Sequence, residues 1–354
     1  MKNKIDASGY SVFFEDARFS MLKKFLRQSY FSRVFILVDR NTEKCCLPAL
    51  LSNIPTLKKA NTIVISSGEK YKNLTTLTFI LESLSKKAAD RNSLLINLGG
   101  GVVGDVGGFA ASIYMRGIAC IHLPTTLLAM ADSSIGGKTG IDFLNFKNQI
   151  GTFYSPKAVF IYTEYLSTLN HNQLLSGFAE IIKSAIISDR KLWNLITRTD
   201  VSKSEWRKYL FSSVSIKNKI VRTDFLEKGE RKILNFGHTI GHAVESFYLG
   251  KKDGLLHGEA VAIGMICETF ISERLGLISK MEMQAIHQFI SVVFKRKKID
   301  LKNFQEILRF IKNDKKNSAG AIRMALPIKI GKCTFDIEVN EDLIFDSIQF
   351  YNVL

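Results

Sequence analysis

Short apolar runs alternate with amphipathic segments through the first half of the chain, and this alternation limits the fold more than any other feature. The β-rich runs are Arg33–Val38, Asn61–Ser66, Ser93–Leu98, Ile118–Leu123 and Val159–Tyr162. Between them, Leu74–Lys87 and Gly108–Met115 have helical spacing. Strands that alternate with helices form a parallel sheet covered by those helices. We therefore predict a Rossmann-like, parallel-sheet α/β domain.

From about Leu166 onward, the apolar residues recur at helical spacing. The expected helices are Leu174–Ile187, Lys191–Thr197, Trp206–Arg222, Thr239–Tyr248, Gly258–Leu275 and Met281–Phe294. Short β-like pieces follow at Met324–Ile328 and Cys333–Ile337. A chain of 354 residues can bury two cores. We predict an α/β domain over residues 1–165 and a mainly α-helical domain over 166–354, with the functional site in the cleft between them.

The composition predicts a cytoplasmic protein. Hydrophobic residues make up 46% of the chain and charged residues 23%, as in ordinary globular proteins. No apolar run marks a membrane span or a signal peptide at the start. The five cysteines are scattered and form no CxxC pair, which argues against disulfides and against a thiolate metal site.

A formal net charge of +16 raises the alternative of a nucleic-acid-binding protein. The densest basic run is Lys295–Lys298, and no aromatic-interleaved or zinc-finger pattern accompanies it. We favour a solvated basic face that attracts small anions, and we expect no nucleic-acid partner.

Glycines follow the third predicted strand. The segment Gly99–Asp105, GGGVVGD, satisfies G-x-G-x-x-G before a helix, so backbone N–H groups there could hold a pyrophosphate. The acidic residue that usually ends the next strand is missing, because that strand runs into Pro124. An ordinary Rossmann fingerprint is therefore in doubt, and Asp39, after the first strand, could take the ribose hydroxyls instead.

The segment Asp132–Gly140, DSSIGGKTG, ends like a phosphate-binding loop but has Asp where a Walker A motif needs Gly. We read it as a flexible turn that presents the carboxylate of Asp132 and the ammonium of Lys138. A purely structural turn is the alternative.

Histidines cluster in the second half. His238 and His242 stand four apart on one helical face, and His257 follows a glycine-containing loop. Two or three imidazoles so placed suggest a metal site, although a core histidine with two solvated ones would give the same pattern. Glu180 and Lys183 lie one turn apart on an apolar helix. A surface ion pair is the ordinary reading of such a pair, but with the histidines downstream Glu180 could complete a three-ligand site.

Nine motifs together resemble the 3-dehydroquinate synthase family within the sugar-phosphate cyclases. In order they are GEKYK, GGGVVGD, YMRG, PTTLLAMADSSIGGKTG, FKNQIG, GFAEIIK, LNFGHTIGHAVE, HGEAVAIGM and NDKK. The resemblance runs from about Asp39 to Gly331, and the long PTTLLA…GGKTG block and GHTIGHAVE are its most specific parts. The departures are small: Arg40 and Phe178 replace the residues usual in the family, and no motif position is lost.

The resemblance implies a lyase of the shikimate pathway that needs NAD and zinc, or cobalt in its place. Its sugar-phosphate substrate would be 3-deoxy-D-arabino-heptulosonate 7-phosphate, and its products 3-dehydroquinate and phosphate. The implied steps are transient oxidation, phosphate elimination, reduction and an intramolecular aldol closure. In the family, the departing phosphate is thought to take the proton itself.

The resemblance also implies a role for each matched position. The metal ligands would be Glu180, His238 and His257. NAD would contact Asp39, Asn41, Glu69, Lys72, Gly100, Gly101, Asp105, Thr125, Thr126, Lys138, Lys147 and Thr163. The substrate would contact Asp132, Lys138, Asn148, Lys183, Lys217, Arg231, Asn235 and His242, with one or both of Lys315 and Lys316. Arg116 would reach the phosphate in a neighbouring subunit, which implies a homodimer.

Two enzymatic alternatives stay open. A related cyclase would close a different carbocycle from another sugar phosphate, and a metal-dependent polyol dehydrogenase would form NADH without releasing phosphate. Retention of Lys217, Arg231, Asn235 and His242 together favours a substrate that carries a carboxylate.

Overall fold

The computed structural model describes residues 3–144, 146–198, 205–251, 254–313 and 321–354. The chain divides into two compact units, Met1–Asn170 and His171–Leu354. Among the described helices, none combines the length and the apolar character that crossing a membrane requires.

The first unit is built on a seven-stranded sheet in the order β1-β2-β9-β6-β5-β3-β4. The strands are β1 Lys4–Asp6, β2 Ser11–Phe14, β3 Val34–Asp39, β4 Asn61–Ile65, β5 Leu94–Gly99, β6 Ala119–Pro124 and β9 Ala158–Ile161. Every neighbouring pair is parallel except β1 with β2. The five strands predicted from the apolar runs are therefore confirmed. The short β1 and β2, which no long apolar run marks, extend the sheet at one edge.

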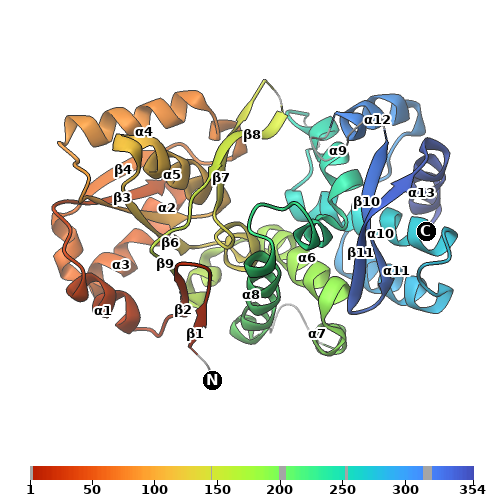
Figure 1. Cartoon of the computed structure of the whole chain (residues 1–354), viewed down its shortest axis with the longest axis horizontal. Helices are drawn as coiled ribbons and strands as arrows, with labels where there is room; N and C mark the ends of the chain where they lie inside the picture. The colour runs from red at the N-terminus through yellow and green to blue at the C-terminus, as the bar shows by residue number, and fades with distance from the viewer. Residues whose placement is uncertain (1–2, 145, 199–204, 252–253, 314–320) are drawn as a thin grey trace. The chain divides into compact units, whose positions relative to one another are not determined.

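Helices cover both faces of this sheet, as expected for a doubly wound α/β fold. They are α1 Ser20–Gln28, α2 Arg40–Cys45, α3 Leu47–Asn53, α4 Leu74–Lys86 and α5 Gly101–Ile113. Figure 1 shows α4 and α5 on one side of the strands and α1 and α3 on the other. Leu37 of β3, Ile80 of α4 and Ala110 of α5 are completely buried in the core beneath α4 and α5.

The helix expected at Gly108–Met115 in fact begins at Gly101, because the glycine-rich segment forms its first two turns. Close packing explains the glycine at position 107. A Cβ at Gly107 would lie 2.0 Å from Oδ1 of Asn97 on β5, so only glycine lets α5 approach the strand this closely.

A hairpin completes the unit. Its strands, β7 Lys138–Phe143 and β8 Phe146–Phe153, pair in antiparallel fashion. At Gly140 and Gly151 the two backbones touch, since a Cβ on Gly151 would lie 2.0 Å from the carbonyl oxygen of Thr139. Lys138, expected on a flexible turn, is instead the first residue of a strand. The short helical turns of the unit are η1 Pro55–Lys59, η2 Glu69–Tyr71, η3 Tyr114–Arg116, the π-helical η4 Ala129–Ser133 and η5 Thr163–Thr168.

The second unit is mainly helical, as predicted. Its helices are α6 His171–Ser188, α7 Arg190–Ile196, α8 Trp206–Thr223, α9 His238–Tyr248, α10 His257–Arg274, α11 Lys280–Val293, α12 Phe304–Lys312 and α13 Glu341–Val353. A hairpin of β10 Ile322–Lys329 and β11 Lys332–Val339, and the short turns η7 Glu230–Asn235 and η8 Leu301–Asn303, complete it. α10 is buried almost continuously from Ala260 to Ser272, which makes it the central helix of this unit.

Candidate functional site

The carboxyl ends of the parallel strands carry six of the twelve residues predicted for the dinucleotide. Asp39 ends β3, Gly100 and Gly101 follow β5, Thr125 and Thr126 follow β6, and Thr163 follows β9. Parallel strands bring these ends to one edge of the sheet, where open α/β folds bind ligands. The structure therefore gathers these residues at one edge. Asp39 also caps α2, because its Oδ1 accepts hydrogen bonds from the N–H groups of Asn41 at 2.8 Å and Thr42 at 2.9 Å.

The glycine loop offers backbone rather than side chains to a ligand. Gly100 precedes α5, and no side chain caps that helix. A Cβ at Gly100 would lie 3.0 Å from Cγ2 of Thr126, and one at Gly101 would lie 3.2 Å from Oγ of Ser133. Free N–H groups at a helix start attract phosphate through hydrogen bonds and the helix dipole. This loop is therefore suited to a pyrophosphate.

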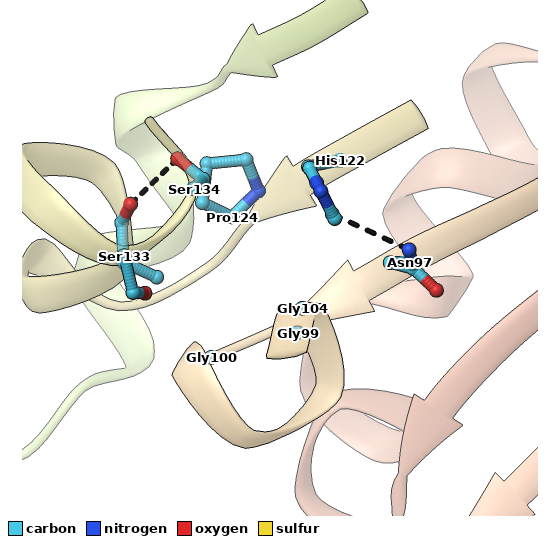
Figure 2. A pocket seen from close by; sticks show the side chains of 9 residues that line it. Asn97, Gly99, Gly100, Gly104, His122, Pro124, Ser133 and Ser134 are labelled. Carbon is cyan, nitrogen blue, oxygen red and sulfur yellow. Dashed lines mark hydrogen bonds between the residues drawn. The ribbon is translucent and has the colours of Figure 1, made fainter. Parts of the chain in front are cut away.

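A small cavity lies beside the glycine loop, lined by Gly99, Gly100 and the polar pair Asn97 and His122 (Figure 2). Nδ2 of Asn97 and Nδ1 of His122 lie 3.3 Å apart. Burial lowers the pKa of His122 to about 4, so the ring is neutral near pH 7. The cavity holds about 10 Å³, which is room for one water molecule and not for a ligand. His122 is therefore a structural residue.

Charged side chains form a network between η2, α5 and the β7–β8 hairpin. Nζ of Lys72 donates to Oδ2 of Asp105 at 2.6 Å and to Oδ1 of Asn148. Nζ of Lys147 lies 3.2 Å from Oε1 of Glu69. Burial alone would lower the pKa of Lys72, but the carboxylates of Asp105 and Glu69 outweigh it and raise that pKa. The structure thus joins five predicted residues around one buried ammonium.

Asp132 and Arg116 occupy two unusual turns. Asp132 lies on the π-helical turn η4, a form that often marks functional sites. Arg116 has a φ of +67° and follows Met115 with a φ of +50°, so two consecutive side chains take the left-handed conformation. Since η3 ends α5 and precedes β6, Arg116 lies at the amino edge of the sheet, away from the glycine loop.

In the second unit, α6, α9 and α10 bring Glu180 to two of the histidines. Oε1 of Glu180 lies 3.4 Å from Nε2 of His238 and 3.5 Å from Nε2 of His257. Donor atoms held about 2.0–2.1 Å from a tetrahedral zinc ion are about 3.3 Å apart, so these separations fit one shared cation. His242 also joins the group, because donor atoms of the three histidines lie within 4.8 Å of one another.

The Nδ1 atoms of His238 and His257 already have hydrogen-bond partners. Nδ1 of His238 lies 3.0 Å from the carbonyl oxygen of Phe236, and Nδ1 of His257 lies 3.2 Å from Oε2 of Glu245. An acceptor at Nδ1 retains the proton there and leaves the lone pair on Nε2, which is how metal-binding histidines are usually oriented. Both Nε2 atoms are therefore directed toward Glu180.

Glu180 shows the electrostatic signature of a cation site. Its side chain is 1% exposed, and neither oxygen has a hydrogen-bond partner among the described residues, although Lys183 forms an ion pair with Oε2. Burial opposes ionisation, but Lys183 and His238 outweigh it and hold the pKa of Glu180 well below its usual range. A buried carboxylate whose Oε1 has no hydrogen-bond partner among the described residues, beside two imidazoles, fits a divalent metal ion.

Several cations and one amide predicted for the substrate belong to the second unit, whereas Lys138 and Asn148 belong to the first. Lys183 of α6, Lys217 of α8 and Arg231 of η7 are all buried, which is rare for side chains of this kind. Nη1 of Arg231 donates to the carbonyl oxygen of Phe225. Nδ2 of Asn235 donates to Oε1 of Glu227 at 2.9 Å. Lys315 and Lys316 lie outside the described residues.

Two carboxylates were not assigned from the sequence. Glu227 accepts a hydrogen bond from the amide of Asn235 and so fixes it. Its φ of +61°, rare for a non-glycine residue, is the only local feature of the structure that draws attention to it. Glu268, on α10, accepts hydrogen bonds from backbone N–H groups at the start of α9. Glu268 can be recognised as unusual only once its burial is known, because it is an acidic residue in a completely buried stretch of α10.

Family models and relatives match most of the chain. Residues 62–176 match the model of the 3-dehydroquinate synthase N-terminal part, and residues 177–317 match that of the C-terminal part. A 3-dehydroquinate synthase of Parabacteroides distasonis is 39% identical over 336 residues, covering 94% of this chain and 95% of that protein. One of Campylobacter concisus is 37% identical over 346 residues, covering 98% and 97%.

Solved structures of related synthases share the fold. A 2-deoxy-scyllo-inosose synthase in complex with carbaglucose-6-phosphate, NAD+ and Co2+ is 26% identical, with a TM-score of 0.85 over 98% of this chain and 99% of that one. The 2-epi-5-epi-valiolone synthase of Streptomyces hygroscopicus is 24% identical with the same TM-score, over 98% of both chains. From the two matching models and the close relatives, the chain belongs to the 3-dehydroquinate synthase family.

Proposed function

We propose that this chain converts 3-deoxy-D-arabino-heptulosonate 7-phosphate to 3-dehydroquinate and phosphate, using NAD and a divalent metal ion. Family membership supports the reaction. The observation that carries the mechanism is the buried carboxylate of Glu180, whose Oε1 lies 3.4 Å from Nε2 of His238 and 3.5 Å from Nε2 of His257.

Each cofactor has residues of this chain that fit it. Glu180, His238 and His257 would hold zinc, or cobalt as in the solved 2-deoxy-scyllo-inosose synthase, which also holds NAD+. The glycine loop would bind the pyrophosphate of NAD, and Asp39 its ribose. When bound, the metal would supply Lewis acidity toward a substrate hydroxyl, and NAD would supply reversible hydride transfer.

The chain's own residues then bind and orient a dianionic substrate. Arg231 has the planar fork that pairs with a carboxylate through two hydrogen bonds. Glu227 orients the amide of Asn235, which follows Arg231 on η7. Lys183, Lys217 and His242 would meet the remaining negative charge. Because these side chains are buried or half-buried, they interact strongly with anions and hold one flexible molecule in a productive conformation.

We infer a homodimer in which Arg116 serves the partner's site. Arg116 lies on a left-handed turn at the amino edge of the sheet. The residues predicted for the dinucleotide of its own subunit lie at the opposite, carboxyl edge. Mixing Arg116→Ala with Lys183→Ala tests this inference. Activity recovered in the mixed dimer supports action between subunits, whereas a mixture as inactive as its parents overturns it.

All five cysteines are unpaired, which supports a cytoplasmic location.

Substrate discrimination tests the proposed function. The purified enzyme, loaded with Zn2+ and NAD+, is offered the heptulosonate phosphate and, in parallel, glucose 6-phosphate, which lacks the carboxylate. Arg231→Lys should raise KM for the former at least tenfold, because a lysine cannot form the paired contact. Lys232→Met is the control, since Lys232 is a neighbouring cation bound to Asp336 at 2.8 Å. Turnover of glucose 6-phosphate alone would refute the proposal.

A further inference from the structure

The helix that carries His238 is held at its start by a side chain from another helix. α9 begins at His238, and no side chain of its own segment caps it. Instead, Oε2 of Glu268 accepts a hydrogen bond from the N–H of Gly237 at 2.6 Å, and Oε1 accepts one from Ile240 at 3.0 Å. Glu268 lies on α10 and is 0% exposed. The two bonded N–H groups lie on either side of His238 in sequence.

The helix that carries His257 is held in the same manner. α10 begins at His257, and the N–H of the next residue, Gly258, donates to Oγ of Ser176 at 2.9 Å. Ser176 lies on α6, one turn before Glu180, and is buried. A Cβ at Gly258 would lie 2.2 Å from the carbonyl oxygen of Ser176, so the two backbones are in direct contact. The helix that carries Glu180 thus fixes the start of α10, and α10 fixes the start of α9.

We propose that Ser176 and Glu268 are positioning residues that set the separation of Glu180, His238 and His257 by locking α10 onto α6 and α9 onto α10. This inference rests on the proposed metal site. The bidentate bond of Glu268 restricts the sliding or rotation of α9, because either movement breaks one of its two hydrogen bonds.

Capping of α9 does not by itself explain why residue 268 is a glutamate. A Ser, Thr or Asn before α9 would satisfy its N–H groups without burying a charge. A completely buried carboxylate is costly unless it is well bonded. Close contacts leave α9 little freedom, because a Cβ at Gly264, one turn before Glu268, would lie 2.0 Å from the carbonyl oxygen of Gly237. The bond from Glu268 and this glycine contact fix the same point of α9.

Two variants with matched controls test the proposal. Glu268→Gln retains the size of the side chain but offers one acceptor oxygen in place of two, so one N–H of α9 loses its partner. Its control is Thr269→Val, the next residue of α10, whose buried hydroxyl donates within its own helix to Met265 at 2.6 Å. Ser176→Ala removes the bond to α10. Its control is Ser184→Ala, also on α6, whose buried hydroxyl lies 3.0 Å from that of Ser213.

The affinity for Zn2+ is measured on the full-length apoprotein by competition with a chromogenic chelator, and the thermal midpoint of the apoprotein is recorded in parallel. The visible spectrum of the Co2+-substituted protein reports ligand geometry. Outer residues that orient metal ligands typically change affinity 10- to 100-fold. We expect at least a tenfold loss of Zn2+ affinity and an altered Co2+ spectrum in Glu268→Gln and Ser176→Ala. The two controls should remain within threefold of wild type, even where their thermal midpoints fall equally.

Each outcome either supports or contradicts the proposed role of Ser176 and Glu268. Selective loss in the two variants supports the proposal. If wild type binds Zn2+ tightly and the variants bind it within threefold of their controls, Ser176 and Glu268 only stabilise the fold, and the inference is wrong while the metal site stands. A wild-type protein that binds no Zn2+ overturns the proposed metal site and this inference with it. Ser176→Ala, the smaller change, decides the matter if Glu268→Gln folds poorly.

Discussion

Oε1 of Glu180 lies 3.4 Å from Nε2 of His238, although the two residues come from separate helices of the second unit. Both side chains are buried, and the pKa of Glu180 is held well below its usual range against the effect of burial, by Lys183 and then His238. An ionised carboxylate and an imidazole lone pair at this distance form the core of the proposed metal site.

Substitution of Glu180 should remove the metal. Glu180→Gln replaces an anionic oxygen by an amide, a far weaker zinc ligand, so we expect stoichiometric zinc to be lost together with turnover. Metal content after dialysis, measured by atomic emission, checks this. Glu282→Gln, which breaks an ion pair with Arg190 on the same unit, should retain its zinc. Full zinc occupancy in Glu180→Gln would show that the ligands are misassigned.

The ammonium of Lys72 should be critical for stability as well as for NAD binding. Lys72→Met leaves Asp105 as an unpaired charge in a site where the lysine side chain is 5% exposed. Breaking a buried pair on one side typically costs about 3–5 kcal/mol of unfolding free energy. Urea titration of the variant measures this cost. Lys86→Met, which breaks an exposed pair with Glu82, should change little, and an equal loss in both would contradict the argument.

Contact between α9 and α10 should depend on Gly264. In Gly264→Ala the new methyl group would lie 2.0 Å from the carbonyl oxygen of Gly237, and a backbone obstacle forces the two helices apart. We expect a stability loss of about 1–3 kcal/mol or more, together with weaker metal binding. Gly104→Ala is the contrasting case, because its Cβ would meet only Nδ1 of His122 at 3.8 Å. A fully stable Gly264→Ala protein would show that the helices have room to spare.

Acid should destabilise the fold through His122. Burial lowers its pKa to about 4 in the folded chain, against about 6.5 when unfolded. Between these values the unfolded chain binds more protons, so this contribution to stability is complete above pH 6.5 and is lost as the pH falls toward 4. Its upper limit is about 3 kcal/mol.

Equilibrium unfolding at several pH values compares wild type with His122→Gln. The variant should show a shallower loss of stability between pH 6.5 and 4, whatever its stability at neutral pH. His287 is buried and shifted in the same direction, so part of the wild-type slope should remain. An unchanged slope in the variant would mean that His122 has the same pKa in the folded chain as in the unfolded chain.

The sequence was most informative where a pattern repeats. Long apolar runs marked β3, β4, β5, β6 and β9, and helical spacing marked most of the second unit. Short or polar strands left no such signal: β1 has three residues with two charges, and the glycines of the β7–β8 hairpin read as a turn. Helices α12 and α13 were also missed.

The same limit applies to the site. Helical spacing pairs His238 with His242, and their ring centroids do lie 4.9 Å apart. Spacing within one helix carries no information about Glu180, which reaches His238 only through the packing of α6 on the histidine-bearing helices. The sequence offered Glu180 only as a possible third ligand, the resemblance to the family assigned it, and the structure places the residues together. Glu268 illustrates the remainder, because its partners are backbone N–H groups that no side-chain motif encodes.

The central claim is tested most directly by following phosphate and NADH together. The enzyme is given the heptulosonate phosphate with NAD+ and Zn2+, and the reaction is repeated with a chelator and without NAD+. We predict one phosphate released per substrate consumed, no net growth of NADH absorbance, and loss of phosphate release when either the metal or NAD+ is removed. Steady accumulation of NADH without phosphate release would identify a dehydrogenase and contradict the account.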